Sequence, residues 1–335
     1  MLTDVYPWQQ GIWASLNRLL NAERLPHAML FAAPAGTGKR RLADAFAARM
    51  LCQTPSLDAA CGQCRGCQLL AAGTHPDYYV LSPETDGDKV SKVIKIDQAR
   101  AVVSFASQTA QMQGYRVIII DPADALNISS ANAMLKTLEE PGQRCVFLLL
   151  TDQPTALLAT IRSRCQLLPL SLPDEEDALA WLRPQLSVPA MAETLLGLAR
   201  GAPLAALALS ESPWFVQRQP ILDALLAVGS GAEQPLTAAQ QFTKVNPIEQ
   251  ITAWQSLLDD AVQQGLAPEL PVRHSDLPSL QKLAEINAQC LLETLWQAVE
   301  ARRLLDDTNV AAATILDNLW LHWARATRQG GHHVR

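Results

Sequence analysis

The stretch "FAAPAGTGKRRLA", residues 31–43, joins an apolar run to a helical segment through a glycine-rich turn. A phosphate-binding loop of the form G-x-x-x-x-G-K-[ST] has this character, because its glycines let backbone N–H groups surround phosphate oxygens. Its lysine neutralises them and its hydroxyl holds Mg²⁺. Three residues of such a loop are in place: Gly36, Gly38 and Lys39. Ala33 replaces the first glycine and Arg40 the hydroxyl, which leaves two interpretations open: nucleotide binding without turnover, and a turn kept for packing.

Residues 1 to about 170 alternate apolar runs with helical stretches, which indicates an α/β fold. Buried strands are predicted at residues 28–33, 77–83, 115–124 and 145–152. Because these runs are apolar throughout, we expect a parallel sheet that helices cover on both faces. A helix is predicted over residues 129–140, and Pro141 ends it.

The chain has 335 residues, which is longer than one typical hydrophobic core requires. Strand-like runs stop after about residue 170, and helical patterns follow. We therefore predict three domains: an α/β nucleotide-binding-like domain at 1–170, a small helical domain at 171–210 and a longer helical domain at 211–335.

The net charge and the apolar runs of the sequence limit which partners the protein can have. The formal net charge is −6, whereas a protein that holds duplex DNA alone over a wide surface is usually basic. Any DNA contact should therefore be local or shared with partners. No apolar run approaches the ~20 residues that a membrane span requires, and the N-terminal residues do not resemble a signal peptide. We expect a cytoplasmic protein without membrane contact.

Four cysteines lie within sixteen residues, at C-x8-C-x2-C-x2-C spacing: Cys52, Cys61, Cys64 and Cys67. Two residues between cysteines suit a tight turn that directs both sulfurs at one ion, and Gly62 and Gly66 tolerate the backbone angles required. Four thiolates predict a structural Zn²⁺ site with no open position. His75 in place of one cysteine, and reduced thiols in a loop, are the alternatives.

Hydrolysis of ATP needs an aspartate at a strand end to hold Mg²⁺ and a following glutamate to polarise water. Asp121 follows the apolar run at 115–120, but the next residue is Pro122, which has no carboxylate and cannot act as a base. Asp121 is either a metal ligand or a strand-end cap. The residues alone thus indicate a nucleotide-binding fold that lacks hydrolytic groups in two places, so catalysis should be slow or absent.

Two segments carry a more specific resemblance, "ANAMLKTLEEP" at 131–141 and "LLATIRSRC" at 157–165. Both resemble the AAA+ subunits of DNA sliding-clamp loaders. The cysteine module between the phosphate loop and the second strand is similar to the bacterial branch of that family, the clamp loader of DNA polymerase III. The resemblance covers residues 1–210 well, whereas the last ~125 residues fit by length and helical character.

The resemblance implies a role for one arginine. Ser163, Arg164 and Cys165 match the family's Ser-Arg-Cys motif, whose arginine points at the nucleotide of a neighbouring subunit. A guanidinium supplied in trans offsets charge that develops on a transferred phosphoryl group. Arg164 is therefore expected to act as an arginine finger, with a solvated or acid-paired arginine as the alternative, and Arg162 as a surface charge.

The resemblance also implies further departures from an active ATPase. Leu204 stands where active relatives carry a sensor arginine, and leucine cannot contact a phosphate. Thr151 matches the first sensor position and remains polar, although a strand-end cap is an equal interpretation. The implied function is a non-hydrolysing clamp-loader subunit of the DNA polymerase III holoenzyme. An ATP-hydrolysing AAA+ protein of the clamp-loader type, and a zinc-dependent nucleic-acid binding module, are the alternatives.

The implied partners are the other subunits of a hetero-pentamer, of the gamma/tau ATPase type and the delta type. The sliding clamp and primer-template DNA would be met through the complex. The helices of 211–335 would form a collar that joins the subunits, after a lid at 171–210. Trp320 and Trp323 suit either a subunit contact in that collar or the packing of the chain's own core.

Overall fold

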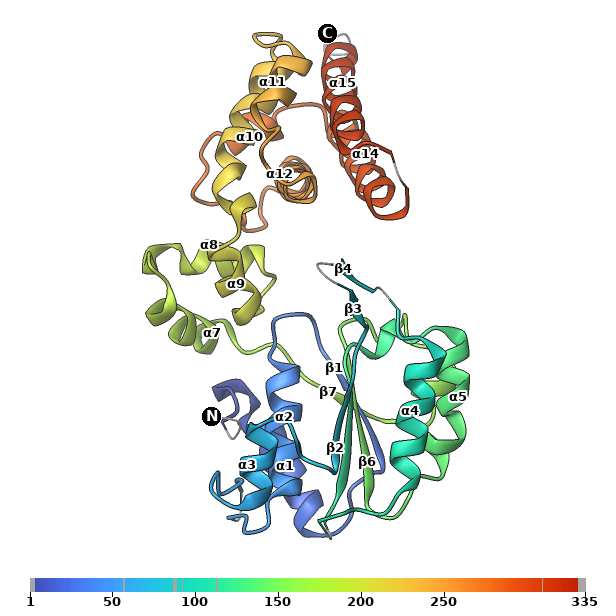
Figure 1. Cartoon of the computed structure of the whole chain (residues 1–335). Helices are drawn as coiled ribbons and strands as arrows, with labels where there is room; N and C mark the ends of the chain where they lie inside the picture. The colour runs from blue at the N-terminus through green and yellow to red at the C-terminus, as the bar shows by residue number, and fades with distance from the viewer. Residues whose placement is uncertain are drawn as a thin grey trace. The chain divides into compact units, whose positions relative to one another are not determined.

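The computed structural model describes residues 4–330 except 57, 87–88, 92, 113 and 309. The chain forms two compact units (Figure 1). Their bounds are Met1–Ala178 with Ala202–Leu204 for the first unit, and Leu179–Gly201 with Ala205–Arg335 for the second. The finer division into three domains stays a prediction.

The first unit is built on a parallel sheet, as the apolar runs predict. Among the described residues this sheet has five strands in the order β2-β5-β6-β1-β7. They span Ala28–Ala32 (β1), Tyr78–Leu81 (β2), Arg116–Ile120 (β5), Cys145–Thr151 (β6) and Gln166–Pro169 (β7). The edge strand β7 is additional to the four predicted strands, and most of its residues are exposed. A short antiparallel pair joins Thr85–Asp86 (β3) to Lys89–Val90 (β4).

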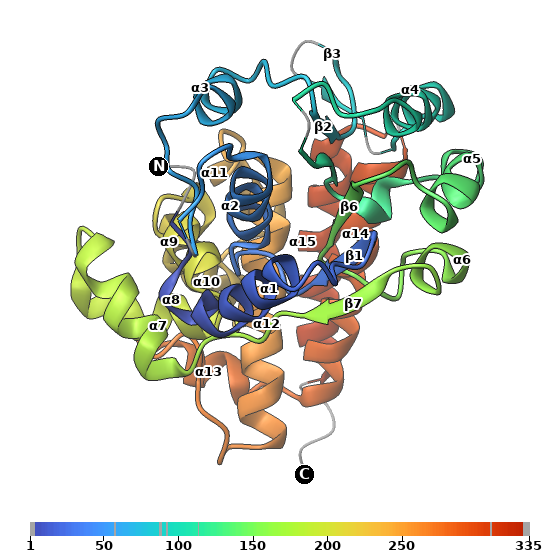
Figure 2. The same ribbon diagram turned by 90° about the horizontal axis from the view of Figure 1, so that it is seen from below.

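Helices cover both faces of the sheet, which confirms that part of the prediction (Figures 1 and 2). Side chains alternate along β5, so Val117 and Ile119 join the core beneath α1 and α2, whereas Ile118 and Ile120 join the core beneath α4 and α5. The helices of this unit are α1 (Gln10–Asn21), α2 (Lys39–Leu51), α3 (Arg65–Ala71), α4 (Ile96–Ser107), α5 (Ile128–Glu139) and α6 (Ala159–Arg162). The 3₁₀ turns are Pro7–Gln9 and Ala123–Ala125.

The rest of the described chain is helical. It comprises α7 (Glu175–Leu182), α8 (Ala192–Leu198), α9 (Pro203–Ser210), α10 (Pro213–Gly229), α11 (Pro235–Gln241), α12 (Pro247–Leu266), α13 (Leu280–Ala284), α14 (Ala288–Asp307) and α15 (Ala312–Gly330), with 3₁₀ turns at Arg183–Gln185 and Pro189–Met191. Several helices begin with proline, whose fixed φ and missing N–H suit the first helical position. Asn246 and Asn287 cap α12 and α14 by accepting bonds from backbone N–H groups.

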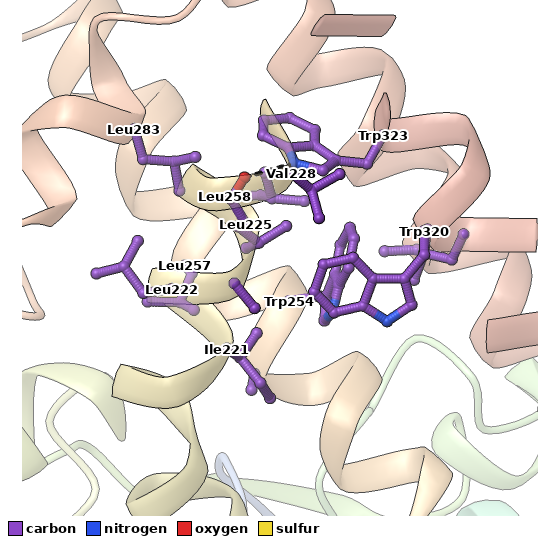
Figure 3. Close-up of a cluster of buried hydrophobic side chains, with 14 of the residues drawn as sticks. Ile221, Leu222, Leu225, Val228, Trp254, Leu257, Leu258, Leu283, Trp320 and Trp323 are labelled. Carbon is purple, nitrogen blue, oxygen red and sulfur yellow. Dashed lines mark hydrogen bonds between the residues drawn. The ribbon is translucent and has the colours of Figure 1, made fainter. Parts of the chain in front are cut away.

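Three tryptophans lie in the core of the second unit (Figure 3). Trp254 meets Trp320 edge-on, with ring centroids 4.6 Å apart. The indole N–H of Trp323 donates to the carbonyl oxygen of Leu225 at 2.8 Å. Trp320 and Trp323 are 1% and 0% exposed. Of the two interpretations of these residues, the packing of the chain's own core is therefore correct.

Within the described part of the chain, no single helix has the length and apolar character to cross a membrane. One bent pair, Pro189–Leu198 with Pro203–Ser210, meets that test by length and composition.

Candidate functional site

The phosphate loop forms the turn between β1 and α2, as its glycines predict. Gly36 and Gly38 have φ angles of 80° and 86°, in the left-handed region that favours glycine. Gly38 is the N-cap of α2, and Lys39 is the first residue of the helix. The loop thus keeps the strand-turn-helix geometry in which backbone N–H groups can face an anion.

The ammonium group of Lys39 has its hydrogen-bond and ion-pair partners within its own chain. Its side chain is nearly buried, and Nζ donates to the carbonyl oxygens of Ala33 at 3.0 Å and Pro34 at 3.2 Å. The ammonium also forms an ion pair with the carboxylate of Asp152, the residue after β6. In a nucleotide-binding loop the same ammonium faces the phosphates. Here it faces the carboxylate of Asp152 instead.

Arg40 pairs with two carboxylates at the end of the sheet where the loop lies. Its Nε lies 3.0 Å from both carboxylate oxygens of Asp44, one turn further along α2, and NH1 lies 3.2 Å from Oδ2 of Asp121. Burial opposes the charge of Arg40, but the two carboxylates outweigh it and raise the pKa of the guanidinium. In a phosphate-loop enzyme, the hydroxyl at this position and the strand-end aspartate hold Mg²⁺. Arg40 instead neutralises Asp121 directly.

Further polar groups complete the cluster. The hydroxyl of Tyr78, on β2, donates to Oδ1 of Asp44 at 2.8 Å, and burial together with Asp44 raises the pKa of Tyr78. Thr151 is 1% exposed, and its hydroxyl donates to Oδ1 of Asp124 at 2.6 Å. Thr151 also accepts a bond from the N–H of Gln153, so it has the contacts of a strand-end cap.

The charge of this cluster is unfavourable for a triphosphate. Two cations of the loop, Lys39 and Arg40, face three carboxylates with which they form ion pairs. These carboxylates belong to Asp44, Asp121 and Asp152. The positive charge that would attract an anion is therefore already balanced from within.

The segment before α1 packs onto the same loop. The indole N–H of Trp8 donates to the carbonyl oxygen of Thr37 at 3.0 Å, and the amide of Gln9 donates to the carbonyl oxygens of Thr37 and Gly38. A Cβ on Gly38 would lie 2.5 Å from the ring of Tyr6, so only glycine lets the two segments approach this closely. A pocket of about 150 Å³ remains beside Trp8 and Thr37.

Leu204, which belongs to the first unit, also reaches the loop. Its backbone N–H donates to the carbonyl oxygen of Gly36 at 3.1 Å. The position that the resemblance assigns to a sensor residue therefore does lie at the phosphate loop. Because leucine has no polar side-chain atom, it cannot contact a phosphate there.

Arg164 lies just beyond α6 and contacts the end of α5. Its Nε and NH2 lie 2.8 Å and 2.5 Å from Oε1 of Glu139, and NH1 donates to the carbonyl oxygen of Thr160 at 2.8 Å. The side chains of Arg164 and Glu139 are 27% and 51% exposed, so the pair is accessible to solvent. The acid-paired alternative thus describes Arg164 in this single chain.

The neighbours of Arg164 have local roles. The hydroxyl of Ser163 donates to the carbonyl oxygen of Thr160 at 3.1 Å, at the end of α6. Burial raises the pKa of the Cys165 thiol to about 12, so this thiol is uncharged at neutral pH. Arg162 is exposed and donates to the carbonyl oxygen of Pro154 at 3.2 Å, in keeping with a surface charge.

The sulfur atoms of the four cysteines lie within 4.8 Å of one another. Three of their separations are 3.8 Å for Cys52 and Cys64, 4.0 Å for Cys61 and Cys67, and 3.5 Å for Cys64 and Cys67. A tetrahedron with Zn–S bonds of about 2.3 Å has edges of about 3.8 Å, so the sulfurs fit such an ion. The cluster can hold a metal ion such as zinc.

Glycine makes this convergence possible. Gly62 has a φ of 72°, in the left-handed region. A Cβ on Gly66 would lie 2.5 Å from the carbonyl oxygen of Leu51, so α3 could not pack as closely against the end of α2. Both glycines are therefore required at the site, the first for its backbone angle and the second for space.

Hydrogen bonds prepare one sulfur for a cation. The Thr54 hydroxyl and the backbone N–H groups of Gln63 and Cys64 lower the pKa of Cys61 to about 6. His75 is not among the converging ligands, which are the four cysteines. Its Nδ1 accepts a bond from the N–H of Asp77 at 3.1 Å. The described residues therefore favour the four-cysteine set over one that includes His75.

Sequence reasoning did not identify three acidic partners: Asp44 of Arg40, Asp152 of Lys39 and Glu139 of Arg164. Asp44 could have been found, because it lies four residues after Arg40 on one helix, the spacing of an intrahelical ion pair. Asp152 follows a strand that ends beside the loop, which was a weaker signal. The pairing of Glu139 with Arg164 depends on how α5 packs against α6, and no sequence pattern indicates it.

Comparison with known proteins identifies relatives of this chain. The family model described as "DNA polymerase III, delta subunit" matches residues 8–174. The DNA polymerase III subunit delta′ of Pseudomonas aeruginosa is 38% identical over 96% of this chain and 98% of its own length. That of Escherichia coli K12 is 40% identical over 70% of each chain. A solved DNA polymerase III gamma subunit-related protein of Thermotoga maritima is 16% identical, with a TM-score of 0.42, and covers 94% of this chain and 99% of its own.

Three short motifs sharpen the resemblance stated above: "HAMLF" at 27–31, "CRGCQLL" at 64–70 and "GTHPDYY" at 73–79. Together with the degenerate phosphate loop they predict the delta′ type of clamp-loader subunit. The relatives that match over most of the chain confirm this prediction. The chain belongs to the family of DNA polymerase III delta′ subunits.

Proposed function

We propose that this chain is a clamp-loader subunit that does not hydrolyse ATP itself and helps to load the sliding clamp onto primed DNA. Its family membership supports a role in the DNA polymerase III clamp loader. The observation that carries the non-hydrolysing role is the pairing of Arg40 with Asp44 and Asp121. A guanidinium of the chain itself thereby neutralises the strand-end carboxylate that would hold Mg²⁺ in an active ATPase.

Two further observations support this proposal. Pro122 follows Asp121 and has no group that could polarise water. Lys39 is paired with Asp152 and hydrogen-bonded to two carbonyl oxygens, so its charge is not available to a phosphate without rearrangement. Gly36, Gly38 and Lys39 thus keep the form of a nucleotide site, and the proposal assigns them no turnover.

Arg164 is proposed as an arginine finger for the ATP site of a neighbouring subunit. It follows α6 at a partly exposed position, where a guanidinium can reach another chain. A planar guanidinium can donate to two phosphate oxygens at once and offset charge in the transition state. Ser163 and Cys165 would fix the backbone that presents it, through the contacts of the hydroxyl and the burial of the thiol.

The proposed partners are gamma/tau-type ATPase subunits and a delta-type subunit in a hetero-pentamer. The first domain would span 1–170, the lid 171–210 and the collar 211–335. In the collar region α14 carries an exposed apolar face made by Leu292, Trp296 and Val299, which are 47%, 63% and 44% exposed. Their spacing of four and three residues places them on one side of the helix. Exposed apolar faces of this kind mark protein interfaces, so α14 is the proposed collar contact in place of α15.

The proposed resident metal is one structural Zn²⁺, held by Cys52, Cys61, Cys64 and Cys67. The near-tetrahedral separations of their sulfurs support zinc, and four protein ligands leave no position for a reacting water. Such an ion would tie α3 and the loop before it to the end of α2, because Cys52 directly follows α2 and Cys67 lies in α3. Its role would be to stabilise this part of the fold.

The finger is tested by Arg164→Ala in the reconstituted clamp loader. The subunits should still assemble, because Arg164 contacts a single exposed carboxylate of its own chain. Clamp- and DNA-stimulated ATP hydrolysis should fall, since the site that Arg164 faces loses on the order of 10³-fold in rate. Steady-state phosphate release measures the rate, and size-exclusion chromatography measures assembly.

The matched control is Arg162→Ala, two residues earlier, where the side chain is exposed and donates to the carbonyl oxygen of Pro154. This variant should keep the stimulated rate. If the assembly with Arg164→Ala hydrolysed ATP at the wild-type stimulated rate, the finger role of Arg164 would be refuted, whether or not the phosphate loop of this chain binds a nucleotide.

A further inference from the structure

The guanidinium of Arg164 forms three contacts within its own chain. Nε and NH2 both point to Oε1 of Glu139, and NH1 donates to the carbonyl oxygen of Thr160. Each of the three nitrogen atoms of the side chain thus has an acceptor on α5 or α6. Glu139 occupies the fork of Nε and NH2, one of the two forks through which a guanidinium donates a pair of parallel bonds, so a phosphate that binds at this fork has to displace Glu139.

We propose that Glu139 is a positioning residue that holds Arg164 on its own subunit until a neighbouring subunit presents a nucleotide. The inference rests on the proposed finger role of Arg164. The Glu139 carboxylate and the phosphate of the neighbour's ATP compete for one guanidinium. Glu139 therefore sets how often the finger is released in an assembly that has not yet met its clamp and DNA.

The position of Glu139 on its helix supports a role beyond helix stability. Glu139 is the last residue of α5, where unpaired carbonyl groups make the helix end negative. A carboxylate is unfavourable at this end, and lysine or arginine is preferred there. The guanidinium of Arg164 offsets that cost. Glu139 is therefore favourable at this position through its contact with Arg164, and not through its effect on the helix.

The ion pair of Glu139 and Arg164 is weak enough to be broken when a phosphate competes for the guanidinium. Both side chains are partly exposed, and an exposed ion pair changes the ratio of paired to separated forms by about two- to five-fold. A triphosphate carries more negative charge than one carboxylate and can replace it. Glu139 thus lowers the fraction of released finger by a small factor and does not block engagement.

The test is Glu139→Gln in the complete reconstituted assembly, with Glu140→Gln as the matched control. Glu140 is the next residue along the chain, and Arg164 contacts Glu139 instead. Without clamp and DNA, Glu139→Gln should raise the rate of ATP hydrolysis by about two- to five-fold. The gain should appear in kcat rather than KM, because a finger acts on the transition state. Glu140→Gln should leave the rate unchanged.

The double variant Glu139→Gln/Arg164→Ala separates this inference from a structural role of Glu139. If Glu139 acts through Arg164, its substitution has no effect once Arg164 is alanine. An unchanged or lower unstimulated rate in Glu139→Gln would overturn the inference, as would a gain that persists in the double variant. If Arg164→Ala alone lowers the stimulated rate while Glu139→Gln does nothing, this inference fails and the finger stands. If Arg164→Ala changes nothing, both fail.

Discussion

The phosphate loop and the four-cysteine cluster both gather ligands for a cation, but they differ in where the cation comes from. At the loop, Asp44 and Asp121 surround the guanidinium of Arg40, which is part of the chain. At the cluster, four sulfurs converge within 4.8 Å, and the residues that meet there are all cysteines. The loop is thus balanced from within, whereas the cluster needs an ion from outside once its thiols ionise.

The same contrast shows how the phosphate loop can keep its shape with Arg40 in place of a hydroxyl. Gly36 and Gly38 keep the turn, and the helix begins at Lys39 as it would in an active loop. Substitution of one hydroxyl by an arginine brings a positive charge to the place where a metal is otherwise needed. The fold keeps its geometry because the carboxylate still has a cationic partner.

The largest expected effect is loss of the metal at the cluster. Cys64→Ser should lower the metal content from one ion per chain to well below one, because a structural zinc site contributes about 10–16 kcal/mol of apparent binding free energy that depends on its ligands. Thermal unfolding of the variant should start at a lower temperature than in the wild type. Metal analysis of purified protein and calorimetry measure both effects.

Cys290→Ser is the matched control for this substitution, since Cys290 is buried in the core of the second unit and is not one of the four clustered cysteines. It should keep the full metal content. If the wild-type protein were purified without metal and gained no stability from added Zn²⁺, the cluster would not need an external ion, and the proposed difference between the two sites would be wrong.

A smaller effect is expected at the loop from Arg40→Thr, which restores a hydroxyl and removes the internal cation. Asp44 and Asp121 then lose their partner, and stability should fall by about 1 kcal/mol, because these ion pairs are partly exposed. Millimolar Mg²⁺ should recover part of this loss in the variant and have no effect on the wild type. Thermal unfolding with and without Mg²⁺ makes the measurement.

Arg41→Thr controls for the loss of one charge on the same helix, because Arg41 bonds the carbonyl oxygen of Asp4 and lies over the ring of Tyr6. Stabilisation of this control by Mg²⁺, or equal stabilisation of the wild type, would show that Arg40 does not take the place of a metal.

The smallest expected effect is in the protons that the cluster releases on metal binding. The pKa of Cys61 is lowered to about 6, so its thiolate is favoured above that pH and is lost as the pH falls through 6. At pH 7 this sulfur is already ionised, and metal uptake by the metal-free protein should release fewer than four protons. Titration with Zn²⁺ in a weakly buffered indicator solution counts them. Release of four protons at pH 7 would show that Cys61 is not prepared for a cation.

The sequence predicts the central sheet and its two covered faces, because apolar runs such as 116–120 are typical of strands whose two faces are both buried in a parallel sheet. It does not predict β7, whose edge position leaves the strand exposed. The convergence of the four cysteines was predictable because their spacing along the chain is local. The ion pair of Lys39 with Asp152 joins residues 113 positions apart and depends on which strand ends lie together. The burial of Trp320 and Trp323 likewise depends on how α15 packs against other helices, which a helical pattern alone does not specify.

The most direct test of the central claim is phosphate release from Mg²⁺-ATP by the isolated chain, measured beside the variant Lys39→Ala. The account predicts that the two proteins release phosphate at the same background rate, because the loop of the wild type is neutralised by Asp44, Asp121 and Asp152. Mg²⁺-dependent release by the wild type that Lys39→Ala abolishes would contradict it.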